Sequence, residues 1–121
     1  MKGRIFIVAL AAASLLSFSA LADSSNKSSV SQSGWGNHAA VGQSASRGGT
    51  NTSSISQKGG FNAAVTGQMA TRGGSNASKV KQSGAFNFVA TGQMATRGGS
   101  NSSAITQSGV GNVAVTVQSA H

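Results

Sequence analysis

The side chains with the clearest chemical pattern in this sequence are amides that recur every 25 residues. A glutamine opens each copy of a repeated segment, an asparagine follows five residues later, and a second glutamine closes the segment. The opening glutamines are Gln32, Gln57, Gln82 and Gln107, the asparagines are Asn37, Asn62, Asn87 and Asn112, and the closing glutamines are Gln43, Gln68, Gln93 and Gln118. A primary amide both donates and accepts hydrogen bonds, so identical amides stacked in a column can bond to one another. The pattern indicates self-complementary hydrogen bonding.

Residues suited to catalysis are sparse by comparison. The only acidic residue is Asp23, cysteine is absent, and His38 and His121 stand outside every repeated column. General acid–base or nucleophilic chemistry needs at least two such groups in a fixed arrangement. We therefore predict that the protein is not an enzyme, needs no cofactor or metal, and has no small-molecule substrate.

The N-terminus has the pattern of an export signal. Lys2 and Arg4 precede a largely apolar run over residues 5–16, and Ala20-Leu21-Ala22 supplies small residues of the type found at cleavage sites. A transmembrane anchor is the competing interpretation, but the apolar run is too short to span a bilayer comfortably. We predict that residues 1–22 are a signal peptide and that the mature chain begins at Asp23.

The composition of residues 23–121 is basic and polar. Seven basic residues stand against one acidic residue, which gives a net charge of +6 and predicts affinity for anionic surfaces. The richness in Gly, Ser, Asn and Gln alone would suggest disorder. The strict repeat and the absence of proline favour an ordered sheet instead, because proline interrupts a backbone hydrogen-bond ladder.

Alternation within each copy predicts two short strands. A β-branched residue stands two positions before each opening glutamine and therefore shares a strand face with it. These predicted core residues are Val30, Ile55, Val80 and Ile105. A glycine stands two positions after the same glutamine, and we predict a turn over four residues there, such as 33–36. The second strand follows this turn, with the asparagine and the closing glutamine of the repeat on one of its faces. The turn glycines are Gly34, Gly59, Gly84 and Gly109.

Four equal strand–turn–strand units predict an all-β fold, a cross-β β-solenoid in which like residues stack in columns. After a lead-in over 23–25, one domain covers 26–121, with repeats at 26–50, 51–75, 76–100 and 101–121. We predict loops over 44–51, 69–76 and 94–101, each of which contains Arg-Gly-Gly. Neither terminal repeat carries the proline or charge cluster that commonly guards an edge strand, so the stack is expected to continue into a neighbouring chain.

The pattern Asn-x5-Gln-x-Gly-x2-Asn-x-Ala-x3-Gln, as in Asn51 to Gln68, closely resembles the repeat of the curlin family, the major and minor subunits of bacterial curli fibres. The resemblance covers residues 26–118. It implies a secreted amyloid subunit that passes through the periplasm and a dedicated outer-membrane export pore, with chaperones, and assembles with itself and other curli subunits at the cell surface. It further implies a role in biofilm matrix, adhesion and surface colonisation. The major and minor (nucleating) roles are not separated, although the basic charge leans towards the minor type.

Two other functions are considered. The aligned arginines Arg47, Arg72 and Arg97 would form a ridge for extracellular DNA or an anionic polysaccharide, or would simply be solvated loop charges, which is the interpretation we favour. A monomeric β-solenoid that binds ice or a polyanion is the alternative to a fibre subunit, with Thr66, Thr91 and Thr116 as the candidate ice-binding column. That column shares its strand face with the core residues, which disfavours the alternative.

Overall fold

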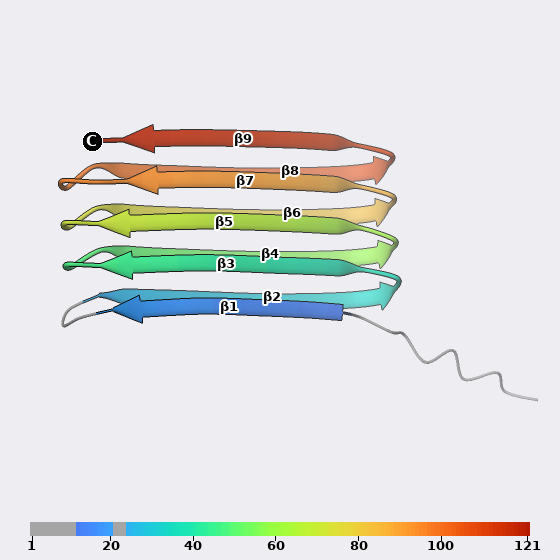
Figure 1. Ribbon diagram of the computed structural model, residues 1–121. Coiled ribbons are helices and arrows are strands. Elements are labelled where there is room, and N and C mark those ends of the chain that lie inside the picture. Colours follow the sequence, from blue (N-terminus) through green and yellow to red (C-terminus); the bar gives the residue numbers. More distant parts are fainter. Residues whose placement is uncertain (1–11, 21–23) are drawn as a thin grey trace, which may run out of the picture.

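The computed structural model of the chain describes residues 12–20 and 24–121, with side chains from residue 24 onward, and the described residues form two parallel β-sheets (Figure 1). One sheet has the order β1-β3-β5-β7-β9 and the other β2-β4-β6-β8. The strands are β1 (Ala12–Ala20), β2 (Ser25–Trp35), β3 (His38–Ser46), β4 (Thr50–Gly60), β5 (Ala63–Thr71), β6 (Ser75–Ala85), β7 (Phe88–Ala95), β8 (Ser100–Val110) and β9 (Val113–Ala120).

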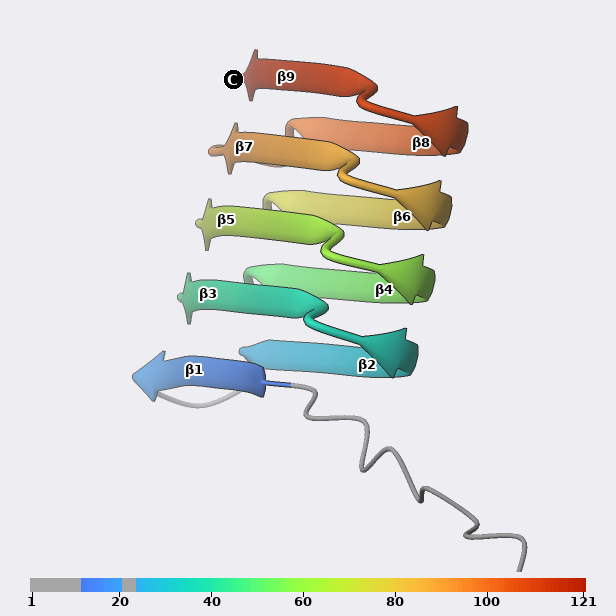
Figure 2. The same ribbon diagram turned by 90° about the vertical axis from the view of Figure 1, so that its right-hand side faces the viewer.

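The chain alternates between the two sheets (Figure 2). Consecutive strands therefore face each other across the interior, and each strand is hydrogen-bonded to the strand two places further along the chain, as β2 is to β4. We call the pairs β2–β3, β4–β5, β6–β7 and β8–β9 the first to fourth rungs. Register between rungs is 25 residues throughout: Gln32 pairs with Gln57, for example, and Gln43 with Gln68. The predicted fold class is confirmed, because the structure is an all-β solenoid of four turns. No helix long and apolar enough to cross a membrane occurs in the described residues.

The loops between rungs are shorter than the sequence predicted. β3 continues to Ser46 and β4 begins at Thr50, so only residues 47–49 connect them, and the predicted loop over 44–51 is wrong at both ends. Arg47 (φ 51°) and Gly48 (φ 76°) adopt the left-handed conformation, and the amide of Gly49 donates to the Ser46 carbonyl at 3.0 Å. Two left-handed residues reverse the chain within a tight turn, which leaves the flanking residues free to extend the strands.

The turn inside each rung also lies later than predicted. β2 runs through residues 33–35, and the chain reverses at Gly36 and Asn37 rather than across 33–36. Gly34 (φ 110°) lies inside the strand, where an added Cβ would overlap the carbonyl oxygen of Gly59 on the next rung. The glycine column therefore allows the backbones of successive rungs to approach closely.

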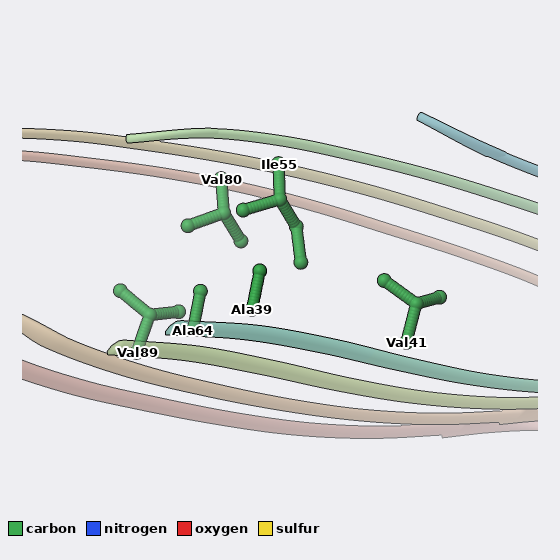
Figure 3. Close-up of a cluster of buried hydrophobic side chains, with 6 residues drawn as sticks. All are labelled: Ala39, Val41, Ile55, Ala64, Val80 and Val89. Atoms are coloured by element: carbon green, nitrogen blue, oxygen red, sulfur yellow. The ribbon is translucent and has the colours of Figure 1, made fainter. Parts of the chain in front are cut away.

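The interior between the sheets combines a small apolar cluster with many buried amide and hydroxyl side chains. Ile55 and Val80 point inward from one sheet towards Ala39, Ala64 and the other buried residues of the opposite sheet, which include Val41 and Val89 (Figure 3). Val30 and Ile105 occupy the same column in the first and fourth rungs and are only partly buried, because they have a neighbour on one side only. A further alanine column, Ala45, Ala70 and Ala95, is buried beside the loops.

β1 lies within the predicted signal peptide. It pairs in parallel with β3, with Ala12 opposite His38 and Ser17 opposite Gln43. The rest of that segment, residues 1–11 and 21–22, falls outside the described residues, as does Asp23 of the lead-in, so cleavage stays a prediction. In a chain beginning at Asp23 the outer edge of β3 would be free, like the outer edge of β9 at the opposite end (Figure 2).

Candidate functional site: amide ladders and the ends of the stack

The opening glutamines form a continuous ladder along the solenoid. Gln32 Nε2 donates to Gln57 Oε1 at 2.7 Å, Gln57 Nε2 donates to Gln82 Oε1 at 2.7 Å, and Gln82 Nε2 donates to Gln107 Oε1 at 3.0 Å. Gln57 and Gln82 are only 1% and 2% exposed. The buried amide of each of these two residues is thus hydrogen-bonded to the equivalent glutamines on the neighbouring rungs.

The closing glutamines form a second ladder, with 2.7 Å between Nε2 and Oε1 at each of the three steps from Gln43 through Gln68 and Gln93 to Gln118. Each Nε2 also donates at 3.0 Å to a backbone carbonyl of the opposite sheet, as Gln43 does to Lys27 and Gln68 to Thr52. This column therefore bridges the two sheets as well as the rungs, which the sequence pattern did not indicate.

Two asparagine ladders run in the opposite direction. Asn62 Nδ2 donates to Asn37 Oδ1 at 3.1 Å, and Asn87 and Asn112 repeat the bond at 2.9 Å. The backbone amide of Asn62 donates to the same Asn37 oxygen at 3.1 Å, which ties the turn of one rung to the turn before it. A fourth amide column, not among the predicted site residues, has equivalent bonds of 2.9 to 3.0 Å between Asn26, Asn51, Asn76 and Asn101.

Because each ladder has a direction, the two ends of the stack are not alike. Each glutamine donates to the rung that follows it in sequence, so Gln118 Nε2 on the fourth rung donates to the Ser102 carbonyl but has no ladder partner among the described residues. On the first rung, Gln43 Oε1 is buried and accepts no hydrogen bond from the described residues. Its Cα partner on β1 is Ser17, a residue without an amide, so the ladder stops there.

The remaining amides show the same polarity. Gln107 Nε2 ends the opening-glutamine ladder on the fourth rung, and Asn112 Oδ1 ends the asparagine ladder there. Asn37 Nδ2 on the first rung donates only to backbone carbonyls, those of Ser33 and Gly59. The groups left over on the last rung are therefore complementary to those left over on the first.

The structure places the four turn glycines in one column with φ between 102° and 113°. The three arginines lie exposed in the loops between rungs, each with φ of 51° or 52°. Backbone bonds align those loops: Gly73 N donates to the Arg47 carbonyl at 3.0 Å, and Gly98 N to the Arg72 carbonyl at 3.1 Å. The arginines consequently follow one edge of the solenoid.

The residues considered for other functions are placed differently. Thr66 and Thr91 are buried, and their hydroxyls have no hydrogen-bond partner among the described residues, so this column does not form an outward ice-binding surface. Met69 and Met94, expected in loops, lie on β5 and β7. Across residues 12–20 and 24–121, no group of three His, Cys, Asp or Glu side chains is placed to hold a metal ion.

The stack of rungs defines a repetitive, amide-rich β-solenoid whose ends are complementary. Comparison of the chain with models of protein families, with curated proteins and with solved structures gave no match.

Proposed function

We propose that this protein is the structural subunit of an extracellular curli-type amyloid fibre that grows by stacking the fourth rung of one copy on the first rung of the next. The observation that carries the proposal is the direction of the closing-glutamine ladder, which leaves Oε1 of Gln43 without a donor on the first rung and Nε2 of Gln118 without a ladder acceptor on the fourth. Once β1 is removed, Gln43 lies at the open edge of β3, and a stacked copy would bury its Oε1 again; a buried acceptor without a partner costs about 1 to 3 kcal/mol. In a stack of copies, Gln118 Nε2 of the preceding chain would occupy the position of its missing donor.

The other columns support the same geometry. The junction is the contact between the fourth rung of one copy and the first rung of the next. If each ladder continues across it, Gln107 Nε2 of the first copy donates to Gln32 Oε1 of the next copy. In the asparagine ladder, Asn37 Nδ2 of the next copy donates to Asn112 Oδ1 of the first. Every junction bond repeats one already present between rungs inside the chain. The axial interface then equals an internal rung-to-rung interface, which is the condition for an open-ended filament.

The proposed biological role rests on the repeat resemblance to curlins. It comprises export through the periplasm and an outer-membrane pore, assembly at the cell surface with curli subunits, and a contribution to biofilm matrix and adhesion. Whether the chain elongates or nucleates fibres is decided by seeding. Added as soluble, unassembled chain at a small molar fraction, a nucleator shortens the lag phase of a major curli subunit, whereas a further major subunit leaves it unchanged.

A charge placed inside the junction tests axial stacking. Thr116 points inward from β9 and is half-buried in a single copy, whereas stacking would enclose it between two rungs. We expect Thr116→Lys in the chain from Asp23 to remain soluble, because burying an unpaired ammonium is strongly unfavourable. The control Thr106→Lys, at an exposed position on β8, should form fibres with reflections at about 4.7 and 10 Å. Fibre formation by Thr116→Lys at the control's rate, or a stable wild-type monomer, would contradict the proposal.

Binding of an anionic polymer is a second proposal, favoured by the alignment of the arginine loops. The three guanidinium groups repeat with the rungs along one edge, and the chain's only acidic residue is Asp23. Fibres should bind double-stranded DNA with an affinity that falls steeply with salt, since binding releases counterions. Replacing all three arginines by glutamine should reduce that salt dependence. An unchanged salt dependence would identify the arginines as solvated loop charges.

A further inference from the structure

The two outer faces of the solenoid differ sharply in chemistry. We call the outward side chains of β3, β5, β7 and β9 the apolar face. Its most exposed members are Val113, Val115 and Val117, which are 70%, 65% and 81% exposed. None of the seven basic residues from position 24 onward lies on this face: four lysines lie on the strands of the other sheet, and the arginines lie in the loops. The face also carries the exposed His38 at the start of β3 but no lysine, arginine or acidic residue, and solvent-exposed apolar side chains gathered on such a face indicate an interaction surface.

A groove runs along this face parallel to the stack. Gly42, Gly67 and Gly92 form its floor, and a Cβ added to any of them would meet no atom within 4 Å. Met69 and Met94 are among the residues that line it, and the groove has a volume of about 550 Å³. On the fourth rung Val117 stands in the glycine column and projects where the first three rungs are open. The face thus carries a groove and a projection of its own.

We propose that the apolar face binds the apolar face of a second copy, with the two stacks running in opposite directions. The projection at Val117 and the groove at Gly42 fit a second copy of the same face, and charge selects this face, because the lysine-bearing faces of two such chains repel each other and the apolar faces do not. A twofold axis parallel to the strands makes the contact self-complementary. It places the first rung opposite the partner copy's fourth rung, and the second rung opposite its third.

This arrangement matches large side chains with small ones at most positions; the exceptions are Gly67 opposite Gly92, Met69 opposite Met94 and His38 opposite Val113. Val117 meets the groove at Gly42, Val115 meets Ala40, and Val65 meets Ala90 of the opposite copy. In the column at the start of the strands, Phe88 meets Ala63 of the opposite copy. Running the copies in the same direction instead places each rung opposite itself, so that Val117 meets Val117 on the fourth rung and all three glycines of the groove meet themselves. Closer packing therefore favours the opposed arrangement, in which Val117 enters the groove at Gly42.

The size of the face makes this contact dependent on assembly. Four rungs at about 4.8 Å and strands of eight residues at about 3.3 Å give a footprint of roughly 500 Å² per copy. Stable specific interfaces bury about 800 Å² per partner, so two single copies would associate weakly. Each copy added to a stack extends the face in register, and the contact strengthens by multivalency. In this respect the inference rests on the proposed fibre function, and the pairing should join filaments rather than free subunits.

Cross-linking between single cysteines tests the register, because the natural chain contains no cysteine. Fibres are grown from equal mixtures of two variants and treated with a bismaleimide that bridges about 10 Å, the spacing of packed sheets. The mixture of Gly67→Cys with Gly92→Cys should yield linked dimers, because these positions lie opposite each other. The mixture of Gly67→Cys with Gly42→Cys is the matched control. In both mixtures the nearest thiols of axially stacked copies are three rungs, or about 14 Å, apart.

We expect more linked dimers in the first mixture than in the second, mainly heterodimers, because Gly67 lies directly opposite Gly92 but one rung, about 4.8 Å, away from Gly67 of the partner copy. The linked dimers should be lost when Val65→Lys is added to both variants. Equal yields in the two mixtures, more Gly67→Cys homodimers than heterodimers in the first mixture, or yields unchanged by Val65→Lys would overturn the proposed pairing. Fibre diffraction of the same samples separates this result from the proposed function. A meridional reflection at about 4.7 Å without selective linking refutes the face pairing and leaves axial stacking intact.

Discussion

The substitution Gln57→Ala removes one amide from the middle of the opening-glutamine ladder. Gln57 accepts a hydrogen bond from Gln32 and donates one to Gln82, both at 2.7 Å. Alanine at this position leaves Gln32 Nε2 without its acceptor and Gln82 Oε1 without its donor. Gln82 is 2% exposed, so solvent does not replace the lost bond there.

The size of the effect follows from these contacts. An orphaned buried amide group costs about 1 to 3 kcal/mol, and the Gln32 group, which is half-buried, contributes at the lower end. The one side-chain methylene lost from the interior, Cγ, adds about 0.8 kcal/mol. The total is about 4 kcal/mol, which corresponds to a roughly 1,000-fold rise in the concentration of soluble protein at equilibrium with fibres.

The assay measures soluble protein after fibres of the chain from Asp23 have reached equilibrium and been sedimented. Arg72→Ala and Ser56→Ala are the controls: the first removes an exposed loop charge, and the second removes an exposed hydroxyl next to Gln57 in sequence. Both should change the soluble concentration less than about tenfold, as surface substitutions usually do. A Gln57→Ala value within the range of the two controls would refute the role assigned to the inward amide ladder.

Two further substitutions test the interior and the turns. Thr66→Val should stabilise the fibre by about 1 kcal/mol, because the Thr66 hydroxyl is buried without a partner and Val41 already occupies that column on the first rung. The denaturant midpoint of fibre dissolution should rise, and Thr52→Val, at an exposed position, should leave it unchanged. Gly84→Ala should prevent assembly, because the φ of Gly84 is 112° and an added Cβ would overlap the carbonyl oxygen of Gly109. The control Gly92→Ala should permit axial stacking, because its Cβ enters open space. Dye-binding time courses compare this pair, and assembly of Gly84→Ala at the wild-type rate would contradict the close approach of the backbones.

The parity of the repeated columns was sufficient to predict the fold class. A strict 25-residue period with Gln57, Ile55 and Asn62 on inward positions admits few arrangements other than stacked strands. The ends of the strands were not predictable in the same way. Arginine and glycine in Arg47-Gly48-Gly49 suggested a long polar loop, but the left-handed conformation of Arg47 closes the turn in three residues. Such a conformation is uncommon for residues other than glycine, so the residue types alone did not indicate it.

The amide columns illustrate a second limit of sequence-based prediction. Identical spacing indicated that Gln43 and Gln68 would stack, but not that the glutamine and asparagine ladders run in opposite directions. The direction of each ladder depends on which backbone carbonyl is in reach of the amide nitrogen, and that is a property of the folded pair of sheets. The direction of the ladders also makes the two ends of the stack complementary. The amide pattern in the sequence did not predict this complementarity.

The chemistry of the buried polar side chains has a consequence for the durability of the assembled material. From residue 24 onward, every buried polar side chain is an asparagine, glutamine, serine or threonine. None of these groups gains or loses a proton in the range of acidity that living cells encounter. Linkage makes stability depend on pH only where the folded and unfolded chains bind different numbers of protons. A filament of the proposed kind, held together by neutral amides, should therefore keep its cohesion from acidic to alkaline surroundings.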